Sequence, residues 1–287
     1  MSSITFQYEQ GPERIIRGDF HPALRPNPQA TVILVHGFKG FKDWGMFPYA
    51  AGRLAESFDV IRFNLSRNGV GASLTDFDEL DKFGKQTFTG DLEDLKDVVV
   101  LVREGKLPVA GRQPVAERVV LVGHSRGGGE SIVLALDEPA LVDGVVSWNG
   151  STSFPAIFGE PALRAMREDG IAYIDNARTK QRMPLEKIIA DDLERNRDRF
   201  DLIARISQLQ VPLVLIQGTD DFRSLWAGSE KLVSAAPSVP WIHIAGGDHT
   251  FSAKHPFNGS TTPLDEAIAA TGREIRERML QRPADLE

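Results

Sequence analysis

Six short apolar runs, rich in valine and isoleucine, restrict most strongly how this chain can fold. They are residues 31–37, 59–64, 118–125, 141–150, 211–218 and 240–247. Runs of consecutive apolar residues are typical of strands that are covered on both faces, as in a parallel sheet. Stretches with helical periodicity lie between them, for example 44–58, 88–105 and the residues after Ser125. This alternation of strand and helix predicts an α/β fold, a doubly wound and mostly parallel sheet with right-handed crossovers.

Both ends of the chain carry further signals. Residues 4–18 alternate polar and apolar side chains around Gly11 and Pro12, which predicts an N-terminal β-hairpin. Residues 261–280 have the pattern of a last helix, with Thr261 or Thr262 as its N-cap.

One interval interrupts the alternation. Residues 151–201 contain no strand-like run, and Leu185, Ile188, Ile189 and Leu193 make a helical stripe. The interval is too long for a bare loop. We therefore expect a small helical cap insert at 151–201, with 1–150 and 202–287 forming the core. The insert should lie beyond the carboxyl edge of the sheet, where such folds bind ligands.

Composition excludes several classes of function. The formal net charge of −7 and the pI near 5.5 argue against binding to nucleic acid or to an anionic membrane. The chain has no cysteine, which excludes disulfides, thiolate metal sites and a cysteine nucleophile. No signal-peptide pattern and no apolar run of about 20 residues is present, so we expect a soluble, cytoplasmic protein. A homodimer through the insert or the sheet edge is compatible with the sequence.

The stretch VVLVGHSRGGGES, residues 119–131, carries the strongest functional signal. It contains G-x-S-x-G between an apolar run and a helix of small residues, which is the strand–turn–helix setting of a nucleophile elbow. Gly123 and Gly127 remove side chains that would clash with such a turn. A glycine-rich loop without catalytic function is the alternative reading of Ser125.

A serine hydroxyl needs a base and an orienting carboxylate before it can act as a nucleophile. Two later strand ends supply candidates: Asp220 and Asp221 follow the run 211–218, and His249 follows the run 240–247. The order Ser, Asp, His is the one expected for an α/β fold with a nucleophile elbow.

Five further histidines are present. His36 and His124 flank tight turns at strand ends, where packing and hydrogen bonding are the expected functions. His243 lies within a strand, and His21 gives no catalytic signal. His255, in the loop after His249, is the serious rival as the base.

An oxyanion hole requires backbone N–H groups aimed at the position where negative charge develops. One donor is normally the residue after the nucleophile, here Arg126. The other comes from the loop after an early strand, here HGFKG at 36–40, which selects Phe38.

Taken together, the motifs HGFKG at 36–40, GHSRGG at 123–128, GTDD at 218–221 and GGDHTF at 246–251 resemble the α/β-hydrolase superfamily. The resemblance runs from about Thr31 to Phe251 and points to the serine esterase and serine aminopeptidase-like members. It implies the α/β-hydrolase fold, Ser125 as nucleophile, His249 as base, and Phe38 with Arg126 as oxyanion donors. It also selects Asp221 over Asp220, because the acid of similar proteins lies three residues after the glycine of G-x-x-D.

The sequence thus predicts a serine hydrolase that cleaves a small-molecule carboxylic ester through an acyl-enzyme. No metal or organic cofactor is expected, because H-E-x-x-H and phosphate-loop motifs are absent. An amidase or peptidase and an acyltransferase use the same machinery and stay open, as does a non-catalytic ligand-binding module. Phe154, Phe158, Trp148 and Trp226 are candidate pocket walls, although ordinary core packing is the better expectation for each.

Overall fold

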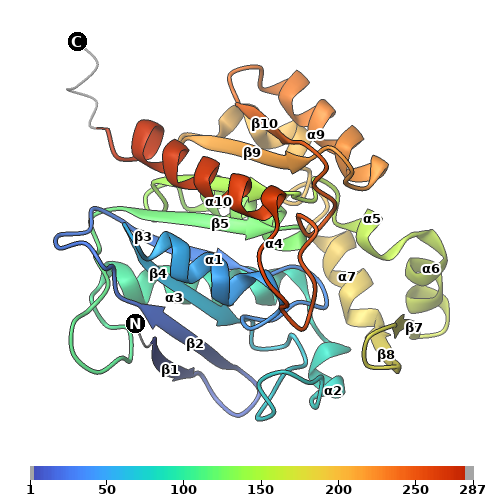
Figure 1. The fold of residues 1–287 in the computed structure, drawn as a ribbon. Helices are drawn as coiled ribbons and strands as arrows, with labels where there is room; N and C mark the ends of the chain where they lie inside the picture. Colours follow the sequence, from blue (N-terminus) through green and yellow to red (C-terminus); the bar gives the residue numbers. More distant parts are fainter. Residues whose placement is uncertain (1–2, 282–287) are drawn as a thin grey trace.

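A twisted eight-stranded sheet forms the centre of the molecule (Figure 1). The structure is a computed structural model that describes residues 3–281. The strand order is β1-β2-β4-β3-β5-β6-β9-β10. The strands are β1 (Ile4–Glu9), β2 (Ile15–His21), β3 (Thr31–Val35), β4 (Asp59–Asn64), β5 (Val119–His124), β6 (Gly144–Trp148), β9 (Leu213–Gly218) and β10 (Trp241–Ile244).

Strand directions confirm the predicted fold class. All six apolar runs form strands, and β4, β3, β5, β6, β9 and β10 are parallel neighbours. The N-terminal residues form the expected hairpin, because β1 pairs antiparallel with β2 and β2 pairs antiparallel with β4. The six parallel strands therefore present their carboxyl ends along one edge of the sheet.

Helices cover both faces of the sheet (Figure 1). The longer ones are α1 (Met46–Leu54), α3 (Phe88–Arg103), α4 (Arg126–Asp137), α9 (Arg223–Ala235) and α10 (Thr262–Glu274), and the short ones are α2 (Leu80–Phe83) and α8 (Leu202–Arg205). Successive strand residues point to opposite faces. Val32 accordingly packs in a cluster with α1 and α10, whereas Ile33 packs in a second cluster with α3 and α4.

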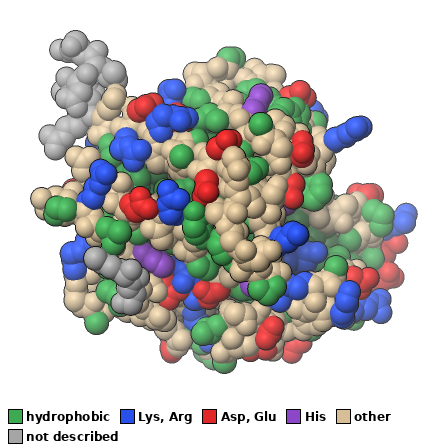
Figure 2. Space-filling model, viewed as in Figure 1, with side chains coloured by type: hydrophobic (Ala, Val, Ile, Leu, Met, Phe, Trp, Pro, Cys, Tyr) green, Lys and Arg blue, Asp and Glu red, His purple; other side chains and the backbone are tan. Residues whose placement is uncertain are grey.

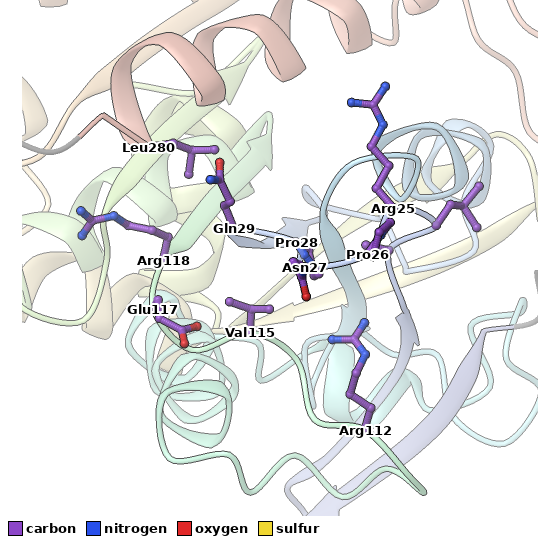
Figure 3. Close-up of a pocket in the computed structure, with 12 residues that line it drawn as sticks. Arg25, Pro26, Asn27, Pro28, Gln29, Arg112, Val115, Glu117, Arg118 and Leu280 are labelled. Atoms are coloured by element: carbon purple, nitrogen blue, oxygen red, sulfur yellow. The ribbon is translucent and has the colours of Figure 1, made fainter. Parts of the chain in front are cut away.

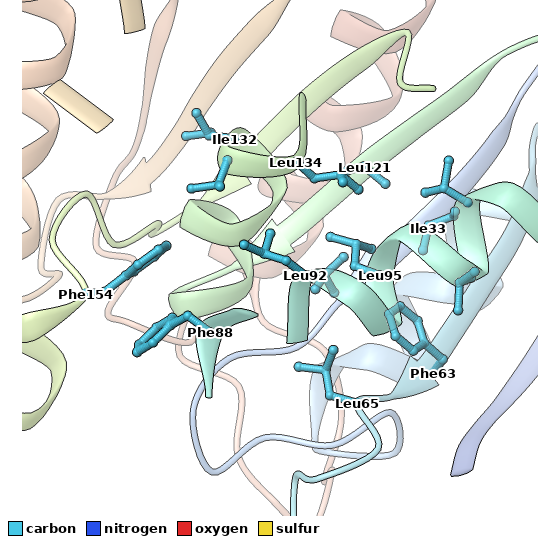
Figure 4. Close-up of a cluster of buried hydrophobic side chains, with 14 of the residues drawn as sticks. Ile33, Phe63, Leu65, Phe88, Leu92, Leu95, Leu121, Ile132, Leu134 and Phe154 are labelled. Carbon is cyan, nitrogen blue, oxygen red and sulfur yellow. The ribbon is translucent and has the colours of Figure 1, made fainter. Parts of the chain in front are cut away.

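The cluster on the α3 and α4 face is the larger of the two and supports the segment that carries Ser125. Figure 4 shows Leu92 and Leu95 of α3, Ile132 of α4, and Ile33 and Leu121 of the sheet as members of one cluster. Because α4 follows Ser125 directly, packing of this helix on the sheet fixes the position of the serine.

The interval 151–201 differs from the expected helical insert. It contains α5 (Pro155–Phe158), α6 (Glu160–Glu168) and α7 (Lys187–Arg195), but also an antiparallel hairpin of β7 (Ile171–Asn176) and β8 (Gln181–Glu186). Leu185 belongs to β8 and not to the helical stripe. Its neighbour Pro184 and the charged residues of the hairpin mask the alternation that normally indicates strands. The division of the chain into core and cap remains a prediction.

The last helix begins where the threonines indicated. Thr261 is the N-cap of α10, and its Oγ1 accepts a hydrogen bond from the N–H of Leu264 at 3.2 Å. A short π-helical segment, Ile275–Met279, continues α10. Within residues 3–281, no helix combines the length and the apolar content needed to cross a lipid bilayer.

Truncation of a core leucine tests the packing of α3. Leu95 is fully buried, so Leu95→Ala should lower the free energy of unfolding by about 2–5 kcal/mol, through lost contacts and the cavity left behind. Leu24 is 48% exposed, and Leu24→Ala should change it by less than about 0.5 kcal/mol. Urea unfolding of both variants measures the difference, and equal losses would contradict the described packing.

Candidate active site

Ser125 lies on a sharp turn between β5 and α4. Its backbone has φ 56° and ψ −119°, a sparsely populated conformation for a residue with a side chain. A Cβ at Gly123 would lie 2.2 Å from the carbonyl oxygen of Gly127, and a Cβ at Gly127 would lie 2.5 Å from that of His36. The backbone is therefore close-packed at this turn, and only glycine fits at positions 123 and 127.

The structure brings the serine, the histidine and one aspartate into contact. Nε2 of His249 lies 3.0 Å from Oγ of Ser125, and Nδ1 of His249 lies 2.8 Å from Oδ1 of Asp221. The N–H of Phe222 and Nε2 of Gln217 each donate to the Asp221 carboxylate at 2.8 Å. These two donors thus orient the buried carboxylate toward the imidazole.

Asp220, the other candidate acid, is not the aspartate in contact with His249. Asp220 is exposed, and its carboxylate is 3.3 Å from Oγ1 of Thr219. Asp221 is 8% exposed and contacts His249. The described contact of Ser125 Oγ is with His249 and not with His255, the rival base, whose Nδ1 accepts the N–H of Gly45 at 2.9 Å.

The loop after β3 lies against the turn. A Cβ at Gly37 would be 2.9 Å from Cβ of Ser125 and 3.5 Å from the backbone nitrogen of Arg126. Arg126 is the first residue of α4, where a backbone N–H has no partner within the helix. Among residues 3–281, the N–H of Phe38 also has no hydrogen-bond acceptor. Arg126 is therefore next to Ser125, Phe38 lines the same cavity, and neither N–H is engaged within residues 3–281.

Asn149 is a residue that the sequence analysis missed. It follows β6 and has φ 47°. Its Nδ2 donates to the carbonyl oxygen of His249 at 2.9 Å and to that of Asp248 at 3.2 Å, and its Oδ1 accepts the N–H of Gly218 at 2.9 Å. Asn149 therefore joins the histidine loop to the end of β9. The asparagine near the end of the run 141–150 was the available signal.

Two buried histidines hold the loops and do not act as charged groups. Nε2 of His124 lies 2.7 Å from the carbonyl oxygen of His249, and Nε2 of His36 accepts the N–H of Leu65 at 3.2 Å. Burial lowers the pKa of His124 to about 3 and that of His36 to about 4. Both rings are neutral at pH 7, as their positions beside turns indicated.

A buried charged cluster lies under the turn. The side chain of Arg126 is 1% exposed, and it pairs with Asp91 at 2.5 Å and with Glu130 at 2.7 Å. Its guanidinium carbon is 3.9 Å from the ring centroid of Phe88. Burial raises the pKa of Asp91 well above its ordinary value and also raises that of Glu130. A raised pKa keeps a proton on the acid pair, which limits the buried negative charge beside one arginine.

A cavity of about 320 Å³ opens over Ser125. Its lining comprises Gly37, Phe38, Lys39, Gly40, Trp44, Phe47, His124, Ser125, Asn176, Arg178, His249, Thr250 and His255. The four candidate wall residues are absent from it. Trp148 and Phe154 are fully buried core residues, Phe158 packs edge-on against Phe38, and Trp226 packs against Trp241. Trp44 and Phe47 provide aromatic walls instead.

A larger hollow of about 1000 Å³ lies away from these residues (Figure 3). Its lining includes residues that precede β3 and β5, so it lies at the amino ends of the strands. Two of its arginines are engaged, because Arg112 pairs with Asp59 and Arg118 with Asp143. Parallel α/β sheets bind ligands at the carboxyl ends of their strands. The cavity over Ser125 is therefore the candidate active site.

Five adjacent parallel strands contribute to this site. Phe38, Ser125, Asn149, Asp221 and His249 follow β3, β5, β6, β9 and β10, respectively. The sequence model of the alpha/beta hydrolase family matches residues 32–259. The chain belongs to the α/β hydrolase family.

Solved structures of several α/β hydrolases are similar to this one. Est1E from Butyrivibrio proteoclasticus matches with a TM-score of 0.69 and 15% identity, over 98% of this chain and 100% of that chain. The esterase domain of a Rhodothermus marinus protein gives 0.64 and 19%, over 97% and 100%. The monoacylglycerol lipase of Paleococcus ferrophilus gives 0.63 and 16%, over 90% and 97%. No curated protein matches the chain at a significant level. At these identities the likeness shows the fold.

Metal ligation has no candidate in this hydrolase among residues 3–281. No three histidine, aspartate or glutamate side chains come together there as a metal site.

The buried acid cluster makes stability depend on pH. The raised pKa of Asp91 means that the folded chain holds a proton that the unfolded chain loses above about pH 4. This contribution to stability is complete below that pH and is lost as pH rises toward the folded-state pKa. Asp91→Asn keeps a neutral side chain at every pH, so its free energy of unfolding should improve relative to wild type between pH 5 and pH 9.

Urea unfolding at several pH values measures this trend. Asp175 is exposed, and Asp175→Asn serves as the control, with a difference from wild type that does not vary with pH. An Asp91→Asn difference that is equally constant would contradict the buried, protonated acid.

Proposed function

We propose that this protein is a serine hydrolase that cleaves a carboxylic ester of a small molecule through an acyl-enzyme intermediate. The observation that carries the proposal is the position of His249, 3.0 Å from the Ser125 hydroxyl and 2.8 Å from the Asp221 carboxylate. These are the contacts that a general base needs with its nucleophile and with the acid that orients it.

In the acylation step, Nε2 of His249 takes the proton of the Ser125 hydroxyl while Oγ forms a bond to the acyl carbon. Negative charge develops on the carbonyl oxygen, where the N–H groups of Phe38 and Arg126 stabilise it. The intermediate collapses with cleavage of the bond between the acyl carbon and the alcohol oxygen. The proton held by His249 passes to the leaving alcohol.

Deacylation repeats these steps with water. His249 removes a proton from the water as its oxygen attacks the acyl carbon, and the bond to Oγ of Ser125 breaks. The proton returns to Oγ, and the carboxylic acid leaves. Asp221 keeps the proton of the neutral imidazole on Nδ1 and stabilises the imidazolium that forms.

An ester is the favoured substrate class for two reasons. Resonance stabilises an amide more than an ester, and an unprotonated amide nitrogen leaves less readily than an alkoxide, so the same machinery acts on esters more readily than on amides. Two structures with this fold are also named as an esterase domain and a monoacylglycerol lipase. Rates on a p-nitrophenyl ester and the matched p-nitroanilide test this preference. A faster anilide reaction would make amides, and not esters, the favoured substrate class.

Replacement of the nucleophile tests the proposal directly. Ser125→Ala should reduce kcat on p-nitrophenyl butyrate by at least about 10³-fold, because only binding and the oxyanion donors remain. Ser153 is exposed, and Ser153→Ala should retain wild-type turnover. Circular dichroism would establish that both variants fold. Substantial turnover by folded Ser125→Ala would rule out the proposed mechanism.

The two neighbouring aspartates form a matched pair. Asp221→Asn should lower kcat by roughly 10⁴-fold at neutral pH, because an amide that donates to Nδ1 favours the wrong imidazole tautomer. Asp220→Asn, one residue away and exposed, should change kcat by no more than about threefold. Ester hydrolysis measures both, and the opposite pattern would assign the orienting acid to Asp220.

A further inference from the structure

Charge is distributed unevenly in the lining of the cavity over Ser125. Two lining side chains, Lys39 and Arg178, are cations, and no aspartate or glutamate is present among the lining residues. This absence contrasts with the whole chain, whose net charge is −7. An acidic protein therefore presents a positively charged pocket.

Neither cation forms an ion pair with a carboxylate of the described residues. Among residues 3–281, no carboxylate forms an ion pair with Lys39 or Arg178, whereas Arg112 and Arg118 of the larger hollow are both paired. Figure 2 shows Lys and Arg side chains next to the indentation between the body of the molecule and the region of α6, β7 and β8.

Two aromatic rings and one backbone carbonyl group hold the Arg178 side chain in place. It lies in the loop between β7 and β8, and its guanidinium carbon is 5.7 Å from the ring centroid of Phe41 and 6.0 Å from that of Phe77. One Nη2 contact reaches the carbonyl oxygen of Thr75 at 3.4 Å. A guanidinium has five N–H donors, so most of them remain free for an anion.

Lys39 lies on the loop that carries a proposed oxyanion donor. It follows Phe38, is partly buried, and has φ 56° within the turn at residues 37–40. The cation is thus one residue from the donor, at the same cavity as Ser125.

His255 adds a neutral donor and not a third charge. Its ring stacks on Trp44 with 5.9 Å between centroids, and its Nδ1 accepts the N–H of Gly45. Burial, with a further contribution from Arg178, lowers the pKa of His255. Asp43 and Asp76 oppose that shift. The neutral ring therefore carries its proton on Nε2. Trp44 and Phe47 supply apolar walls beside these polar groups.

We propose that the site takes esters that carry a negatively charged group, in the first place a carboxylate, which Lys39 and Arg178 bind while the aromatic walls hold the apolar part. This inference rests on the proposed ester hydrolysis and specifies its substrate class. A charge-assisted hydrogen bond to a carboxylate is stronger than a neutral one, and the guanidinium fork matches two carboxylate oxygens.

Paired substrates of equal shape test the charge preference. In the acyl series, the p-nitrophenyl monoester of adipic acid is compared with p-nitrophenyl 6-methylheptanoate, in which an isopropyl group replaces the carboxylate. In the alcohol series, 4-acetoxybenzoate is compared with 4-acetylphenyl acetate. We expect kcat/KM to favour the anionic ester by roughly 10-fold or more in at least one series, the range of a hydrogen bond to a charged group.

Variants assign the preference to the two cations. Arg178→Gln and Lys39→Gln should each lower the ratio of anionic to neutral kcat/KM by about 3- to 10-fold, and Arg178→Glu should reverse the preference. Arg182 is on β8 with its guanidinium over Tyr173, outside the cavity lining, so Arg182→Gln should leave the ratio unchanged. The preference should also shrink between 0.05 and 1 M salt (about 14 Å and 3 Å screening lengths), which a purely structural effect would not do.

The outcomes separate this inference from the proposed function. Hydrolysis of the neutral esters with no charge preference in either series would overturn the anionic substrate class and leave the serine hydrolase standing. A preference that survives Arg178→Glu and high salt would overturn it as well. Absence of turnover with all four esters, together with no reaction of Ser125 with a fluorophosphonate, would reject the proposed function itself.

Discussion

Close approach of backbone around Ser125 is the constraint on which the rest of the site depends. The loop after β3, the end of β5 and the start of α4 meet at distances that exclude a Cβ at Gly123 and at Gly127. This contact forces Ser125 into a left-handed conformation with φ 56°. It also brings the backbone N–H of Arg126 and the HGFKG loop to the same place. The positions of Ser125 and of the proposed oxyanion donors are thus consequences of one packing arrangement.

Polar groups hold α4 and the loop of His249 against this turn. Below it, Arg126 lies buried between Phe88 and two acids, so the side chain of this proposed oxyanion donor anchors the start of α4. Above it, Asn149 and the neutral His124 hold the carbonyl oxygen of His249. A strained turn persists only when its surroundings over-determine it. Here the contacts of Asp91 and Glu130 with Arg126, and of Asn149 with the His249 loop, hold the strained turn in place.

The sequence predicted the sheet and the residues at its strand ends, because both follow local rules. Apolar runs identify buried strands, and a glycine on each side of Ser125 identifies a turn that excludes side chains. The sequence did not predict the β7–β8 hairpin, because Pro184 and charged residues interrupt its alternation of polar and apolar side chains. The sequence did not predict the cavity walls for a different reason. Trp44, Arg178 and His255 come from three distant segments, and only tertiary packing brings them together.

The most direct test of the central claim, an activated serine at the strained turn, is intact-mass measurement after treatment with a fluorophosphonate. The account predicts one adduct on the wild-type chain and none on Ser125→Ala, because Ser125 alone among the serines contacts an imidazole oriented by a carboxylate in residues 3–281. An unmodified wild-type chain, or an adduct that persists in Ser125→Ala, would contradict it.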